Sequence, residues 1–135
     1  MTLSGRNSSV KTLAISNITG NNNSKGLTLS GSGSSINTLK ISNVDAGNTA
    51  TGAEFTTNVS SDTSITVTDV SASGNNSNAY GIKLTSGWIS TYALNTSQTS
   101  VSDISAKSEA FGIYSQDKFV GKATYVQNIK GTSIK

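Results

Sequence analysis

The chain repeats itself with a period of 26 residues, and this repeat restricts the available folds more than any other feature of the sequence. Residues 2–30 align without a gap with residues 28–56, and thirteen of the 29 aligned pairs are identical. A fixed period of about 20–50 residues is typical of solenoids and related arrays, in which each unit buries its apolar face against its neighbours. With 33% hydrophobic residues the chain would otherwise suggest disorder, and the repeat argues against it.

Each unit contains two short apolar patterns that indicate β-strands. The first, as in residues 13–18 (LAISNI), is an apolar pair two residues apart, then Asn or Asp, then another apolar residue. The second, as in residues 26–29 (GLTL), starts at a Gly and continues with alternating apolar positions. A spacing of two is the period of a strand, and no stretch shows the 3.6-residue period of a helix.

The repeated strand patterns predict an all-β fold, a parallel β-helix or β-solenoid. Equivalent strands would stack in parallel at about 4.8 Å per coil. We expect about 26 residues per coil, four to five coils, a right-handed turn, and a single domain over residues 1–135. Three interior ladders of equivalent residues are predicted: Ile15, Ile41, Val67, Val101 and Val126; Ile18, Val44, Val70, Ile104 and Ile129; and Leu27, Ala53, Ile82 and Ile113.

One position of the first pattern is always Asn or Asp, and it interrupts the alternation of apolar residues. Both residue types tolerate left-handed backbone angles and suit a tight bend between two strands. Stacked amides can also bond from coil to coil. The alternative is a row of groups that binds a metal or a sugar. The structural corner ladder comprises Asn17, Asn43, Asp69, Asp103 and Asn128.

The repeated glycines indicate bends or close approaches of the backbone. None lies between a strand and a helix, so a phosphate-binding loop is not favoured. Tyr80 and Phe111 each precede such a glycine, and we expect them to stack on adjacent coils as ordinary packing. The glycines are Gly26, Gly52, Gly81 and Gly112.

Two insertions in the third unit predict longer loops, at residues 73–77 and 86–98. Insertions in a solenoid map to loops outside the stack, where binding sites often lie. The second insertion carries Trp88 and Tyr92, which are the candidate binding residues for a sugar ring or a protein partner. The alternative is that both side chains fold back onto the solenoid.

Composition removes several functional classes. The chain has no His and no Cys, which excludes a Ser-His or Cys-His catalytic pair and a zinc site of those ligands. Among the acids only Asp69 and Asp103 align between coils, so we expect no enzyme activity, no catalytic residue, no metal and no cofactor. A scattered net charge of +3 with one Arg predicts no nucleic-acid partner, and no apolar run is long enough for membrane insertion.

The repeats resemble those of autotransporter passenger domains of Gram-negative bacteria. The resemblance rests on units such as residues 101–106 (VSDISA) leading to 110–114 (AFGIY), and residues 67–72 (VTDVSA) leading to 79–82 (AYGI). They are similar to the repeats of adhesins and vacuolating-cytotoxin-like surface proteins. The resemblance implies an exported, elongated, right-handed β-helix that serves adhesion or acts as a rigid stalk, and it carries over no catalytic residue.

The expected function is that of a secreted or cell-surface adhesin or passenger-type stalk, which binds a host receptor or a glycan. The alternative is a filament subunit whose partners are other copies of itself, stacked end to end. A phage tail-spike fibre and a polysaccharide-active enzyme are less favoured. Two interpretations stay open: a segment of a longer passenger, whose export signal lies elsewhere, or a small subunit with stacking ends.

Replacing Asp69 by Asn tests the corner interpretation. Asp69 and Asp103 are expected one coil apart, so the substitution removes a like-charge repulsion and keeps a residue that tolerates the bend. We expect a free energy of unfolding that is unchanged or higher, measured by chemical denaturation. A large loss of stability would instead indicate that the carboxylate pair binds a cation or takes part in chemistry.

Overall fold

The structure of the protein, a computed structural model, describes residues 1–31, 35–56, 63–85, 91–94, 98–116, 118–121, 124–131 and 133–134. These residues form β-strands and no helix, and therefore include no helix that could cross a membrane. The strands are β1 (Thr2–Leu3), β2 (Ser9–Gly20), β3 (Asn23–Leu29), β4 (Ser35–Ala46), β5 (Thr49–Phe55), β6 (Ser64–Ala72), β7 (Asn78–Leu84), β8 (Thr91–Leu94), β9 (Gln98–Ala106), β10 (Glu109–Ser115), β11 (Lys118–Gly121), β12 (Thr124–Lys130) and β13 (Ser133–Ile134).

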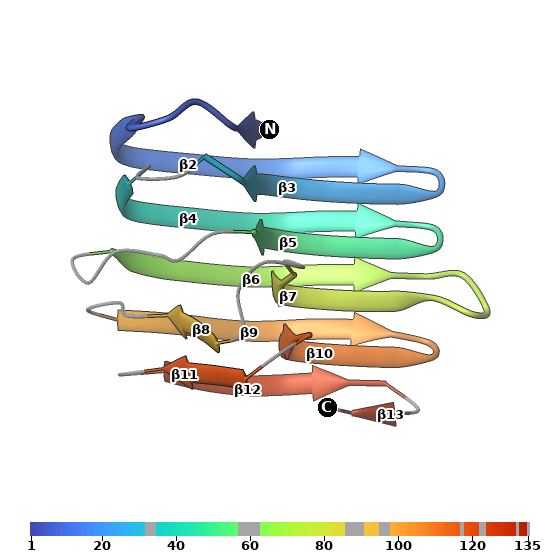
Figure 1. The fold of residues 1–135 in the computed structure, drawn as a ribbon. Coiled ribbons are helices and arrows are strands. Elements are labelled where there is room, and N and C mark those ends of the chain that lie inside the picture. Colours follow the sequence, from blue (N-terminus) through green and yellow to red (C-terminus); the bar gives the residue numbers. More distant parts are fainter. Residues whose placement is uncertain are drawn as a thin grey trace.

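The strands stack in parallel into a β-solenoid of about four turns, which confirms the predicted fold class (Figure 1). The six-stranded sheet has the order β1-β3-β5-β7-β10-β13, and the five-stranded sheet has the order β12-β9-β6-β4-β2. A two-stranded sheet joins β8 and β11. The register follows the sequence period, since Leu13 pairs with Leu39, and Leu39 pairs with Ile65.

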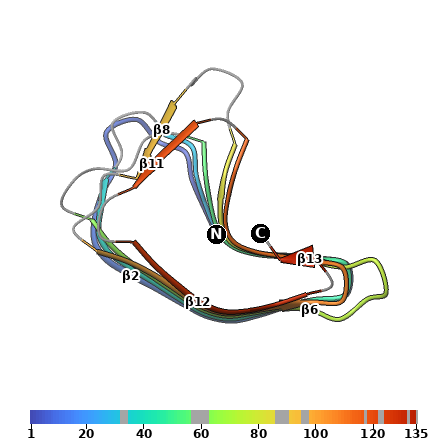
Figure 2. The same ribbon diagram turned by 90° about the horizontal axis from the view of Figure 1, so that it is seen from below.

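The coil is right-handed, as parallel crossover connections almost always are. In Figure 1 the strands of the five-stranded sheet run to the right, and the C-terminal coils lie at the bottom. Figure 2 views the molecule from below, and the chain there passes along the five-stranded sheet and returns along the six-stranded sheet above it. The chain therefore turns counter-clockwise as it approaches the viewer.

The core includes the three predicted ladders, and the strand register confirms each of them. It also includes buried ladders that were not predicted, such as Leu29, Phe55 and Leu84. In the middle coils Ile41, Val67 and Val101 are each 0% exposed. Each residue stacks on its equivalents above and below, so a few apolar residues per coil form one continuous core. This arrangement explains how a chain that is 33% hydrophobic supports a folded structure.

All five corner residues adopt the left-handed backbone conformation, with φ between 53° and 57°. Along a strand, side chains point alternately into the core and out to solvent, and the left-handed residue interrupts this alternation once. Both Val67 and Val70 therefore point into the core, while Asp69 between them is exposed. The strand continues on both sides of the corner, as in β2, where the register pairs Ser16 and Ile18 with the next coil and skips only Asn17. The corner is therefore a bend inside one strand, whereas the sequence pattern suggested a junction between two strands.

The repeated glycines mark the second bend, in the six-stranded sheet, where the two sheets approach closely (Figure 2). A Cβ atom on Gly52 would lie 2.6 Å from the carbonyl oxygen of Gly81 and would overlap a methyl group of Val67 in the facing sheet. Equivalent contacts occur at Gly26 and Gly81. None of these glycines has a positive φ, so space rather than backbone conformation requires glycine.

The two expected loops differ in structure. Residues 73–77 connect β6 to β7 in the place where only residues 47–48 connect β4 to β5, and this longer connection projects from the stack in Figure 2. Its Ser77 is 0% exposed and donates a hydrogen bond of 2.8 Å to the carbonyl oxygen of Ala72. In the span 86–98, which the sequence suggested as a loop, residues 91–94 form strand β8 beside β11.

Replacing Gly52 by Ala tests the close packing of the two sheets. The added methyl group must displace Val67 and the backbone of the next coil, so we expect the free energy of unfolding to fall by about 1–3 kcal/mol. The double variant Gly52→Ala/Val67→Ala should lose less than the sum of the two single variants, because the shortened side chain relieves part of the overlap. Chemical denaturation measures both effects. A Gly52→Ala protein as stable as the parent would contradict this packing.

Candidate functional site

The bend at the glycines gives the six-stranded sheet an outer surface with two arms that face each other, which we call the concave face (Figure 2). Its residues alternate with the ladder positions and follow the strand register, and two of them, Thr51 and Phe111, are themselves buried, with 3% and 5% exposure. The first arm contributes Lys25, Thr51, Tyr80 and Phe111, and the second arm contributes Thr28, Glu54, Lys83 and Tyr114.

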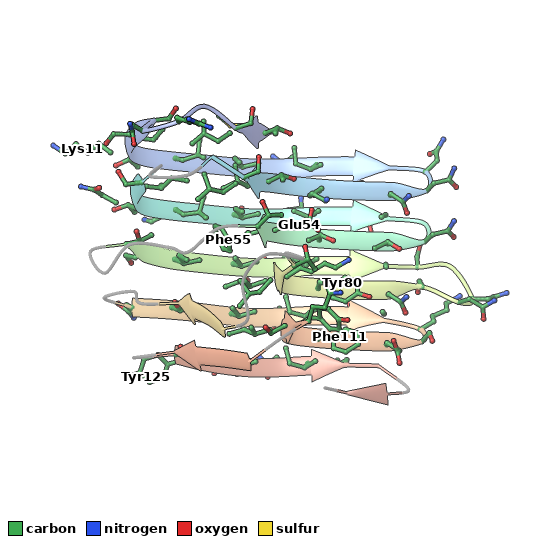
Figure 3. All side chains as sticks on the ribbon, in the orientation of Figure 1. Lys11, Glu54, Phe55, Tyr80, Phe111 and Tyr125 are labelled. Atoms are coloured by element: carbon green, nitrogen blue, oxygen red, sulfur yellow. The ribbon has the colours of Figure 1, made fainter. Side chains whose placement is uncertain are left out.

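An aromatic cluster occupies the C-terminal part of the concave face. The rings of Tyr80 and Phe111 stack with centroids 4.9 Å apart and an interplanar angle of 5°, which confirms the stacking expected from the sequence (Figure 3). Tyr114, from the opposite arm, meets both rings edge-on, with centroids 5.5 Å from Tyr80 and 5.2 Å from Phe111. Such offset and edge-on pairs are the favoured geometries for aromatic rings.

A lysine completes this cluster. The Lys83 Nζ lies 4.8 Å from the centroid of the Tyr80 ring and 6.0 Å from that of Tyr114, within the range of a cation–π interaction. Partial burial raises the pKa of the Tyr80 phenol, and the charge of Glu109 and the neighbouring Tyr114 raise it further. The phenol is therefore protonated at neutral pH and can donate a hydrogen bond.

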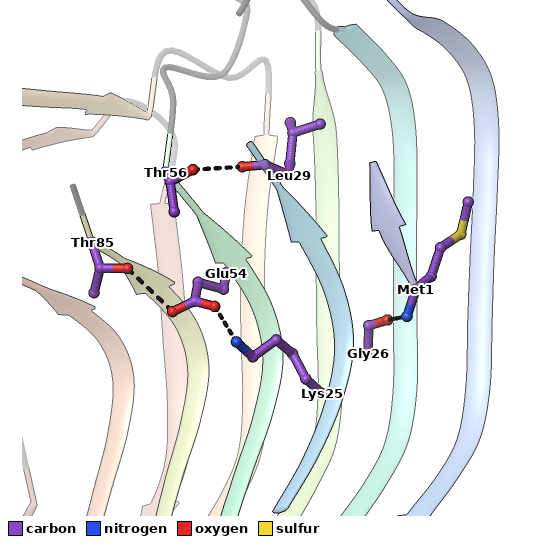
Figure 4. A network of polar contacts seen from close by, with 7 residues as sticks. All are labelled: Met1, Lys25, Gly26, Leu29, Glu54, Thr56 and Thr85. Atoms are coloured by element: carbon purple, nitrogen blue, oxygen red, sulfur yellow. Dashed lines mark hydrogen bonds and ion pairs between the residues drawn. The ribbon is translucent and has the colours of Figure 1, made fainter. Parts of the chain in front are cut away.

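A polar network occupies the N-terminal part of the concave face (Figure 4). Lys25 forms an ion pair with Glu54 across the bend, and the Thr85 hydroxyl donates a 3.1 Å hydrogen bond to Glu54 Oε1. Partial burial raises the pKa of Glu54, but the hydrogen bond and charge of Lys25, the bond from Thr85 and the charge of Lys83 outweigh it, so that the pKa lies below its usual value. Glu54 is therefore ionised at neutral pH.

The two parts of the concave face meet at a hollow of about 240 Å³. Its polar lining presents two ammonium groups beside hydroxyl and amide groups, all carried on strands. The lining residues are Asn23, Ser24, Lys25, Thr49, Thr51 and Lys83. Such a surface can donate several hydrogen bonds to one ligand without any rearrangement of the backbone.

The corner ladder lines a second hollow, also of about 240 Å³, on the outer surface of the five-stranded sheet. The Asn43 amide donates a 2.7 Å hydrogen bond to Asn17, and the Asn128 amide donates a 3.1 Å bond to Asp103. Asp69 and Asp103 lie on adjacent coils, are exposed, and are bridged by the Thr68 hydroxyl at 3.3 and 3.5 Å. Within the described part of the chain, no group of three or more acidic, His or Cys side chains gathers to hold a metal.

The residues that the sequence analysis selected for binding do not form part of the concave face as described. Trp88 lies outside the described residues. Of Tyr92 the structure describes only the backbone, which lies in β8 opposite Phe119 of β11. Their proposed role stays a prediction.

Sequence reasoning missed six of the eight residues of the concave face: Lys25, Thr28, Thr51, Glu54, Lys83 and Tyr114. A signal for them exists, because each lies one residue before or two residues after a repeated glycine. The apolar positions of the repeat do not include these residues, so the hydrophobic pattern alone does not identify them. The outward positions on both sides of the glycine are those that a concave bend brings together.

No protein-family model, no curated protein and no solved structure matches the chain. Function therefore has to be argued from the site rather than from kinship.

Replacing Glu54 by Gln tests the polar network through its pH dependence. Because folding lowers the pKa of Glu54, its carboxylate stabilises the protein above the pKa of the unfolded chain, and this stabilisation is lost as the pH falls through the folded pKa. We expect the parent to lose more stability than Glu54→Gln between neutral pH and pH ~3, by less than about 1 kcal/mol because Lys25 is partly exposed. Urea denaturation across this pH range measures the difference. Identical pH profiles would contradict the assigned contacts.

Proposed function

We propose that the protein is a non-catalytic β-solenoid rod that binds a glycan on its concave face, in the manner of an adhesin or passenger-type stalk. The observation that carries this proposal is the cluster of Tyr80, Phe111 and Tyr114 with Lys83 on an outward surface. Tyr80, Tyr114 and Lys83 are each partly exposed. Outward positions elsewhere in the repeat are mostly Ser, Thr, Asn and Lys, so this cluster is set apart from the general surface.

The chemistry of the concave face suits a sugar. Tyrosine combines an apolar ring with a polar tip, and such amphipathic rings are favoured at binding surfaces. The exposed parts of the Tyr80 and Tyr114 rings can contact the C–H groups of a pyranose. The neighbouring hydroxyl, amide and ammonium groups of the hollow can then bond its hydroxyls or a carboxylate.

The scaffold supports binding because the site lies on hydrogen-bonded strands rather than on loops. Side chains on regular strands hold their positions more precisely, and less conformational entropy is lost when a ligand is bound. The stacked coils also form a rod that holds the site at a distance from the two ends of the solenoid, as a stalk does.

The geometry favours binding over hydrolysis. Glycoside hydrolysis generally requires two carboxyl groups on either side of the bond that is cleaved, one of them protonated. Glu54 is the carboxylate among the eight residues that define the concave face, and Glu109, two residues before Phe111 on β10, lies near enough for its charge to act on Tyr80. The lowered pKa of Glu54 and its bonds to Lys25 and Thr85 keep Glu54 from acting as a general acid.

We place this rod outside the cell, secreted or on the cell surface. The support for this location is the resemblance of its repeats to passenger domains. The absence of Cys is compatible with export and adds no further weight.

Glycan-array binding by matched variants tests the proposal. Tyr114→Ala and Lys83→Ala should each weaken binding of a captured glycan at least about tenfold, because both remove direct contacts. Lys40→Ala is the control, since Lys40 is an exposed lysine on β4, in the other sheet.

Thermal unfolding of each variant establishes that the fold is kept. If the parent binds no glycan, or if Lys40→Ala weakens binding as much as Lys83→Ala, the concave face is not a glycan site. Binding to a host protein without any glycan would likewise overturn the choice of ligand.

A further inference from the structure

We propose that the glycan bound on the concave face is acidic. A sugar that carries a carboxylate or a sulfate ester places this anion between Lys25 and Lys83, and a neighbouring sugar contacts the aromatic cluster. This inference rests on the glycan site proposed above, and it adds the charge, the minimum length and the direction of the ligand.

The hollow beside the aromatic cluster is lined by cations and neutral groups. Lys25 and Lys83 contribute its two ammonium groups, and the other lining residues are Asn, Ser and Thr. Thr49 and Thr51 come from β5, the strand that lies between those of the two lysines. Hydrogen bonds from ammonium groups to an anion are stronger than those to a neutral hydroxyl, so this lining favours an anionic group.

The ion pair between Lys25 and Glu54 does not hide the positive charge from a ligand. The side chain of Lys25 is 43% exposed, whereas that of Glu54 is 14% exposed. Glu54 also accepts the hydrogen bond from Thr85, so its oxygens are directed toward partners within the protein. An ammonium group has three donors, and those that Glu54 does not use remain for a ligand.

Lys83 supplies the second positive charge. Its Nζ lies 4.8 Å from the centroid of the Tyr80 ring, and among the described residues Lys83 forms no ion pair. Glu54 acts on it only through longer-range attraction, which also lowers the pKa of Glu54. Because an ammonium group is a compact point charge rather than a planar fork, it accepts a carboxylate or a sulfate equally well.

The distribution of charge along the concave face gives the ligand a direction. Glu109 lies on β10, at the aromatic end, near enough for its charge to act on Tyr80. The two lysines line the hollow at the other end. The acidic sugar should therefore lie over the hollow, and a neutral sugar should contact Tyr80 and Tyr114.

The distances along the rod set the minimum length of the ligand. Lys25 on β3 and Lys83 on β7 are two coils apart, or about 10 Å along the axis. Tyr114 on β10 pairs with Lys83 and lies one coil farther, about 14 Å from Lys25 along the axis. A single pyranose is too short for this span. A ligand that contacts both the hollow and the aromatic cluster has at least two sugars and runs along the rod.

Two matched pairs of hexasaccharides test the charge. Hyaluronan carries carboxylates only and is compared with its carboxyl-reduced form, whereas keratan sulfate carries sulfates only and is compared with its desulfated form. Calorimetric titration of the parent chain should show the acidic member of one pair or both binding about tenfold more tightly than its neutral partner. Salt raised from about 50 to about 500 mM should weaken the acidic member more.

Two variants should change this acidic preference in opposite directions. Lys25→Gln removes an ammonium group and should lower the ratio of acidic to neutral affinity about tenfold. Glu54→Gln should raise the same ratio, because it releases Lys25 from its ion pair and removes a carboxylate that repels the ligand. The control is Lys40→Gln, an exposed lysine in the other sheet, which should leave the ratio unchanged. A purely structural role of the ion pair would move both variants in one direction, and thermal unfolding verifies each fold.

Several outcomes would overturn the acidic ligand. Neutral partners that bind as tightly as the acidic members would do so, as would a poly-glutamate peptide that binds as tightly as the acidic hexasaccharide. Equal effects of Lys25→Gln and Lys40→Gln would contradict the assigned contacts. If neither pair binds while neutral glycans on the array do, the acidic ligand is wrong and the glycan site stands. If no glycan binds, the proposed function fails as well.

Discussion

The parallel register between coils is the constraint on which the rest of the structure depends. Each strand of the two large sheets bonds to its equivalent in the next coil, 26 residues later between β2 and β4 and 34 residues later between β6 and β9, and this pairing places every side chain over an equivalent one. A shift by one residue would move the apolar set to the outside. The left-handed residue at 17, 43, 69, 103 and 128 makes such a shift still more costly, because few residue types accept its φ. The corner ladder thus fixes the alignment as well as the bend.

The glycine bend has a different consequence, because it shapes the outer surface. Glycine lets the six-stranded sheet approach the facing sheet, and the two arms on either side of the bend then face each other. Side chains that belong to different repeat positions and to different coils meet there. Lys25 reaches Glu54, and Lys83 lies over Tyr80. The same small residue that closes the core therefore creates the only candidate glycan site that we derive from described side chains.

The sequence predicted the contacts between equivalent positions and missed those between different positions. The ladders, the corner and the stacking of Tyr80 on Phe111 follow from the period alone, since equivalent residues in a solenoid must be neighbours. The edge-on contact between Tyr80 and Tyr114 depends on the angle between the two arms, which the packing of the core sets. The pairing of β8 with β11 was missed for a related reason, because insertions carry no repeat from which a register can be read.

The sequence by itself determined the period, the repeated strands, three of the ladders in the core and the residues at the two bends. Short-range stereochemistry and repetition are sufficient for those, because each is a property of one unit copied along the chain. Only the tertiary structure decided which outward residues meet on the concave face. That meeting depends on the angle between the two arms, which is a property of the assembled coils rather than of any single repeat.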